Sequence, residues 1–148
     1  MQKENWRKRW LSSINELTSI GLQRISWLDK ENTNPHWSFV EFMCCYFDGL
    51  AINDNYKYQL ERNWVTETEY QIILDWHSRL DKYEAPNKDA CDVVKILNDE
   101  NWLRIVEIGE KVKERLVNQL PENEKEILTE MIDYTKYETV KNENESNN

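Results

Sequence analysis

The scarcity of glycine and proline constrains this fold most, since the 148-residue chain contains three of each. Folds rich in sheets and tight turns need both, because glycine adopts positive φ angles and proline presets turn dihedrals. A chain this poor in them is expected to consist of long helices, and its length suits one domain. We therefore predict an all-α protein, with a single compact helical domain over residues 1–137 and about six or seven helices.

The least polar stretch runs from Asn34 to Asp48. Asn34 can cap a helix, Pro35 fits its first position, and Gly49 can end it. The apolar residues cover most of the circumference and leave one narrow polar stripe. That stripe consists of Ser38, Glu41, Cys45 and Asp48. Because a helix that is apolar nearly all round is usually buried, we predict that residues 35–48 form a buried central helix.

Helical patterns precede and follow this stretch. Residues 3–19 carry apolar side chains at helical spacing, and a second short helix is expected over 22–28 after an interruption at Gly21. Residues 50–65 favour a short helix or an irregular segment, because their aromatic residues fit both helical and alternating spacing.

Capping signals mark the helices of the C-terminal half. Thr66-x-x-Glu69 is a capping box, which predicts a helix from there to about residue 83. A long amphipathic helix is expected from residue 98 or 99 to about 119, where Gly109 on the apolar stripe would allow close approach of a neighbouring helix. Pro121 is expected to begin the last helix. Residues 138–148 are polar throughout, so we expect a disordered acidic tail.

The net charge of −9 restricts the possible partners. An acidic protein repels the phosphate backbone, so nucleic-acid binding is not expected, whereas a basic protein partner is attracted. No apolar run approaches the roughly 18 residues of a membrane span, and the first ten residues lack the apolar core of a secretory signal. The chain has three cysteines, two of them adjacent at Cys44 and Cys45, a pattern that favours reduced thiols and a cytoplasmic location.

Residues suited to catalysis or metal binding are few. Glu41 and Asp48 would lie roughly 10 Å apart along a helix, too far to share one metal ion. The two histidines, His36 and His77, show neither zinc-site spacing nor the spacing of a Cys–His nucleophile. We expect His36 to be structural, close to a helix start. No phosphate loop or nucleophile elbow is present, so we predict no catalytic residue, no metal ligand and no cofactor.

Aromatic and acidic side chains are the best candidates for partner binding. Trp and Tyr dominate interface energetics, and several of them lie in the segments whose structure is hardest to predict. The binding residues that we predict are Glu41, Asp48, Trp37, Trp27, Tyr56 and Tyr58.

Two stretches carry a family resemblance: P-H-W-S-F-V-E-F-M-C-C-Y-F-D-G-L (35–50) and I-L-N-D-E-N-W-L-R-I-V (96–106). They resemble segments of small helical bacterial proteins of unknown function. Some of those proteins are similar to the immunity proteins that accompany secreted bacterial toxins. The stretches contain no catalytic motif and cover under a fifth of the chain, so the resemblance implies no site residue.

Together these features favour a non-enzymatic acidic module that neutralises or regulates a basic protein partner, with toxin immunity as its concrete form. The alternative is a small helical enzyme or ligand-binding protein with a site along Glu41, Cys45, Asp48 and His77. That alternative predicts a pocket with converging polar groups and shifted pKa values. A third interpretation, an oligomerising scaffold subunit, predicts a large exposed apolar face. The sequence does not determine the oligomeric state.

Overall fold

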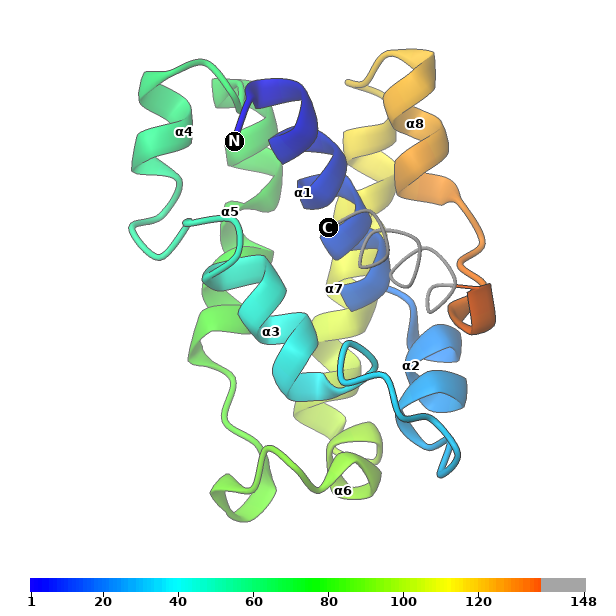
Figure 1. Ribbon diagram of the computed structural model, residues 1–148. Helices are drawn as coiled ribbons and strands as arrows, with labels where there is room; N and C mark the ends of the chain where they lie inside the picture. The colour runs from blue at the N-terminus through cyan, green and yellow to red at the C-terminus, as the bar shows by residue number, and fades with distance from the viewer. Residues whose placement is uncertain (137–148) are drawn as a thin grey trace.

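Eight α-helices and two 3-10 turns, without a β-strand, make up residues 1–136, the part of the chain that the computed structural model describes (Figure 1). The predicted all-α single domain is confirmed, with one helix more than the upper expectation. In chain order the elements are α1 (Lys3–Leu17), α2 (Ile20–Trp27), α3 (Phe39–Phe47), α4 (Lys57–Glu61), α5 (Glu67–Lys82), η1 (Pro86–Lys88), α6 (Val93–Leu97), α7 (Glu100–Val117), α8 (Glu122–Thr129) and η2 (Tyr134–Lys136). Within this part of the chain, no helix combines the length and apolar character that crossing a bilayer requires.

Helix α1 lies in the middle of the fold and packs against α2, α3, α7 and α8 (Figure 1). Eight of its 15 residues are buried, against six of 18 in α7. Five apolar side chains of α1 are at most 2% exposed: Trp6, Trp10, Leu11, Ile14 and Leu17. The first helix of the chain, and not residues 35–48, therefore supplies the centre of the core.

The predicted central helix is wrong in both extent and burial. Helix α3 begins at Phe39, and the Ser38 hydroxyl caps it by accepting from the backbone N–H of Glu41. Asn34 does not cap the helix. Its side-chain Oδ1 accepts from the backbone N–H of His36 at 3.0 Å, which closes an Asx turn ahead of the helix. In α3 the buried residues are Phe39, Phe42 and Tyr46. Helix α3 is thus amphipathic and lies against α1 with its opposite face in solvent.

Helices α5 and α7 pack side by side, and the local signals predicted for them are present. Thr66 and Glu69 form both hydrogen bonds of the capping box. A Cβ atom on Gly109 would lie 2.7 Å from Trp76 Nε1 and 2.6 Å from Thr18 Cγ2. The expected close approach at this glycine is confirmed, because the backbone of α7 is in contact with the indole of α5.

Arg7 joins three distant parts of the chain through one guanidinium. It donates from Nε and Nη2 to Glu124 at 2.8 and 2.9 Å, and from Nη1 and Nη2 to Glu69 at 3.0 and 2.8 Å. Nη1 also donates to the carbonyl of Trp64 at 2.8 Å. All five N–H groups are therefore accepted. Burial alone would lower the pKa of Arg7. The hydrogen bonds to Glu124 and Glu69 have the larger combined effect, so the pKa lies above its ordinary value. The cluster connects α1 to α5 and α8.

Some predicted boundaries shift by a few residues. Helix α1 ends at Leu17, and Gly21 lies inside α2 instead of in the interruption. Residues 50–65 contain the expected short helix, α4, which follows Tyr56 in the left-handed conformation at φ 66°. The acidic tail predicted over 138–148 lies outside the described residues.

Candidate functional site

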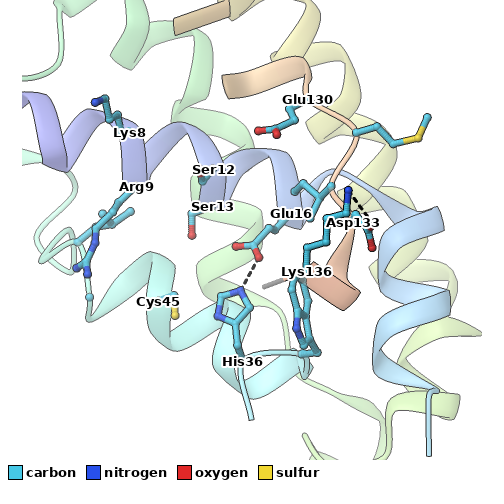
Figure 2. Close-up of a pocket in the computed structure, with 15 residues that line it drawn as sticks. Lys8, Arg9, Ser12, Ser13, Glu16, His36, Cys45, Glu130, Asp133 and Lys136 are labelled. Atoms are coloured by element: carbon cyan, nitrogen blue, oxygen red, sulfur yellow. Dashed lines mark hydrogen bonds and ion pairs between the residues drawn. The ribbon is translucent and has the colours of Figure 1, made fainter. Parts of the chain in front are cut away.

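A cavity of about 660 Å³ opens between α1, the end of α3 and the segment that follows α8 (Figure 2). Small-molecule sites typically enclose roughly 300–1,000 Å³. We call this cavity the thiol pocket. The lining residues with polar, charged or reactive groups are Lys8, Arg9, Ser12, Ser13, Glu16, His36, Cys45, Glu130, Asp133 and Lys136.

Glu16 and His36 form an ion pair at one side of the thiol pocket. Glu16 lies in the last turn of α1, and the Asx turn of Asn34 places His36 opposite it. His36 Nε2 lies 2.5 Å from Glu16 Oε2, and the two side chains are only 13% and 10% exposed. Burial lowers the pKa of His36, but hydrogen bonds and charge at Cys45 and Glu16 raise it more, to about 9. His36 is therefore positively charged at neutral pH.

Cys45 lies beside the same imidazole. In Figure 2 the thiol of Cys45 is next to the His36 ring, on the side away from Glu16, and a hydrogen bond between the two side chains contributes to the raised pKa of His36. Cys45 is partly exposed and lines the thiol pocket, whereas the adjacent Cys44 is exposed outside it. Burial, together with the charges of Asp48 and Glu41, raises the pKa of Cys44. The two neighbouring thiols thus have different surroundings.

Basic side chains line part of the thiol pocket. Lys8 and Arg9 come from the outer face of α1, and Lys136 comes from η2, where it lies 3.9 Å from Asp133. Together with cationic His36 they make this region more basic than the net charge of the chain would suggest. Ser12 and Ser13 of α1 also line the thiol pocket (Figure 2).

A second hollow of about 320 Å³ lies between the end of α2, the following loop and the first turn of α3. We call it the acidic groove. Trp27, Trp37 and Val40 supply apolar surface in this groove, and Asp29 and Glu41 supply carboxylates. Apolar and acidic groups therefore meet at one place on the surface.

The carboxylate of Asp29 is held in position by Tyr134, whose hydroxyl donates to Oδ2 at 2.6 Å. This bond and one from the backbone N–H of Glu31 lower the pKa of Asp29, so it is ionised. Val40, which lines the groove, is 37% exposed, and Leu28, which precedes Asp29 in the chain, is 43% exposed. Exposed apolar side chains thus adjoin a fixed negative charge.

Three of the six predicted binding residues line the acidic groove: Trp27, Trp37 and Glu41. The expectation that the two tryptophans would be exposed is wrong, because Trp27 is 7% and Trp37 is 4% exposed. Asp48 is at the other end of α3, where Asn53 donates to it at 3.3 Å. Tyr58 is 42% exposed and has the guanidinium of Arg62 stacked over its ring at 3.4 Å. The predicted binding residues therefore do not form one site. They lie at the two ends of α3 and near α4.

Tyr56 is fully buried and belongs to a polar network in the core, so the expectation that it would be exposed is wrong. Trp10 Nε1 donates to the Tyr56 hydroxyl at 3.0 Å, the Tyr56 and Tyr46 hydroxyls lie 2.5 Å apart, and Tyr46 lies 2.9 Å from His77 Nδ1. Burial lowers the pKa of His77, partly opposed by Asp81. A neutral His77 can accept from Tyr46 at Nδ1. His77 is thus a core residue and lies away from the thiol pocket.

The grouping of Glu16, His36 and Cys45 could not be predicted from the sequence. His36 and Cys45 are nine residues apart, but Glu16 comes from another helix, and no local pattern relates it to them. Among residues 1–136, no three His, Cys, Asp or Glu side chains are arranged to hold a metal ion.

Comparison with known proteins adds no family to this geometry. No protein-family model matches the chain, and no curated protein or solved structure shows significant similarity to it.

Proposed function

We propose that this protein binds a basic protein partner through the acidic groove and neutralises or regulates that partner by covering its surface. A bacterial toxin-immunity protein acting in the cytoplasm is the concrete form of this proposal. The observation that carries it is the meeting of Trp27, Trp37 and Val40 with the carboxylates of Asp29 and Glu41 in one hollow.

The two kinds of side chain would contribute differently to binding. The carboxylates of Asp29 and Glu41 suit a Lys or Arg side chain of the partner, and the net charge of −9 would speed the encounter. The exposed apolar surface of Val40 and Leu28 would exclude water around that contact and slow dissociation. Specificity would thus come from a basic side chain flanked by apolar ones.

Affinity capture from the cells that produce the protein tests this function. The bait is the full chain, compared with Glu41→Lys in the acidic groove and with Glu114→Lys on the exposed face of α7, which makes the same charge change elsewhere. We expect a basic protein to be retained by the unaltered chain and by Glu114→Lys, but not by Glu41→Lys. Equal loss with both variants would mean that only overall charge matters, and would count against the groove.

Association kinetics with the captured partner supply the second measurement. Screening weakens interactions between exposed charges, with a Debye length of about 10 Å at 0.1 M salt. The association rate should fall as salt rises, and Glu41→Lys should reduce this dependence. An association rate that does not change with salt would contradict electrostatic steering.

A second candidate function, a small helical enzyme or ligand-binding protein, is favoured by the thiol pocket. Converging polar groups and a shifted pKa are what that hypothesis predicts, and both occur there. Of the site proposed from the sequence, Cys45 lines this pocket, whereas Glu41, Asp48 and His77 do not.

A further inference from the structure

Three side chains in the thiol pocket lie in a row, with the imidazole of His36 between a carboxylate and a thiol. Glu16 Oε2 pairs with His36 Nε2, and the opposite side of the same ring faces the thiol of Cys45 (Figure 2). A nucleophile, a histidine and an acid that orients the histidine are the parts of a covalent catalytic site. The acid comes from α1, the histidine from the loop before α3, and the thiol from α3 itself.

We propose that Cys45 is the nucleophile of an acyl-transfer site, and that the thiol pocket takes small esters or thioesters of carboxylic acids. This inference rests on the second candidate function and is independent of the acidic groove. His36 and Cys45 act as catalytic residues in it. Glu16 is a positioning residue, because it acts on the reaction through His36.

The charge on His36 prepares the thiol for this role. Glu16 holds a proton on His36, so an imidazolium lies beside the sulfur of Cys45 and stabilises negative charge on it during attack. Cys45 lies near the C-terminal end of α3, where the helix dipole opposes a negative charge. The imidazolium is therefore needed to offset that effect, and Glu16 keeps the imidazolium protonated.

The reaction balances with water as the second substrate. The Cys45 thiolate attacks the carbonyl carbon, and the alcohol or thiol leaves with the proton of His36. Neutral His36 then takes a proton from water, whose oxygen attacks the acyl thioester on Cys45. The carboxylic acid departs, and the thiolate and imidazolium are restored.

Other groups in the thiol pocket suit such a substrate. The hydroxyls of Ser12 and Ser13 and the guanidinium of Arg9 are donors that can stabilise an oxygen gaining negative charge. Lys8 and Lys136 add positive charge to the pocket lining, which suits an acyl compound that carries a carboxylate or phosphate. The acids that face the same space, Glu130 and Asp133, lie on the segment after α8.

The three cysteines of the chain provide an internal comparison. Cys44 and Cys91 are both more exposed than Cys45, so access alone predicts that Cys45 reacts most slowly with an alkylating reagent. Activation by His36 predicts the reverse order. The rates can be measured in the unaltered full chain, without any substitution that could disturb folding.

The first experiment is alkylation with limiting iodoacetamide at neutral pH, with each cysteine followed by peptide mass spectrometry. We expect Cys45 to react about tenfold faster than Cys44 and Cys91. His36→Gln and Glu16→Gln should slow alkylation of Cys45 while leaving that of Cys44 and Cys91 unchanged, which a general loss of structure would not do. A rate for Cys45 equal to or below that of Cys44 would overturn the proposal.

The second experiment uses p-nitrophenyl acetate as the probe ester. We expect a burst of nitrophenolate, a mass increase of one acetyl group on Cys45, and a loss of about a hundredfold in rate for Cys45→Ser. Cys44→Ser is the matched control and should retain the burst. Fast alkylation of Cys45 without acetylation or turnover would refute acyl transfer and leave the thiol pocket as a ligand-binding site. Slow alkylation together with no turnover would also remove the enzymatic form of the second candidate function.

Discussion

Arg7 and Glu69 form a two-point ion pair, with Nη1 donating to Oε1 at 3.0 Å and Nη2 donating to Oε2 at 2.8 Å. The side chains are 11% and 4% exposed, so the pair is largely shielded from solvent. Glu124 accepts from the same guanidinium at 2.8 Å. Two carboxylates from separate helices therefore depend on one cation.

Replacing this cation should destabilise the protein strongly. Arg7→Met would leave Glu69 and Glu124 buried without a counter-ion, and loss of one partner from a buried pair costs about 3–5 kcal/mol. Urea unfolding followed by circular dichroism measures the change. Arg79→Met is the control, because the Arg79 pair with Asp75 is exposed and should contribute less than about 1 kcal/mol. Equal losses in the two variants would contradict the importance of the cluster.

Gly109 and Gly21 should respond in opposite directions to substitution by alanine. In Gly109→Ala the new methyl group would overlap Trp76 and Thr18, and overpacking of this kind costs about 1–3 kcal/mol. Gly21 has no atom within 4 Å of an added Cβ and lies inside α2, so Gly21→Ala should stabilise by up to about 1 kcal/mol. Thermal melting of the two variants tests both signs, and a stabilising effect of Gly109→Ala would be inconsistent with the close approach.

His36 should make the protein less stable at alkaline pH. Its pKa is raised from 6.5 to about 9 in the folded state, so the folded chain holds a proton that the unfolded chain releases. The stabilisation is complete below pH 6.5 and is lost as pH rises to about 9, by an amount on the order of 3 kcal/mol. Urea unfolding across this range should show the decline, and His36→Gln should remove it. A slope that persists in the variant would assign it to another group.

His77 should make the protein less stable at acidic pH. Its pKa is lowered in the folded state, so below pH 6.5 the unfolded chain binds a proton that the folded chain resists. Stability should therefore fall as pH decreases from 6.5 through the lowered pKa. The acid limb of the stability profile should become flatter in His77→Gln while the alkaline limb persists. This independence of the two limbs distinguishes the two histidines.

Local signals predicted much of the fold. The capping box at Thr66 and Glu69 and the glycine at position 109 appear in the structure as expected, because both depend on residues within one helix or on its face. The start of α3 was missed because Asn34 can cap a helix or close an Asx turn with equal chemistry. In the structure the backbone N–H of His36 donates to the side-chain oxygen of Asn34. The sequence alone does not indicate which of the two arrangements forms.

The central position of α1 and the candidate sites depend on contacts between distant residues. The polar network that buries Tyr56 requires Trp10 and Tyr46, which are 46 and 10 residues away. Glu16 reaches His36 only after α1 and the loop before α3 have packed together. Charge and composition indicated a possible partner class for the acidic groove. They could not predict the thiol pocket, because the net charge of −9 gives no sign that a few basic residues gather at one place.

The contact between Arg7 and Glu124 spans 117 residues, and it has a consequence for synthesis on the ribosome. The helix at the middle of the core is made before the side chains that cover its flank. A nascent chain halted before α8 should therefore leave α1 open to protease and to chaperones. Protection of α1 should appear only once α8 has left the ribosome, and protection on ribosomes stalled before that point would contradict this order.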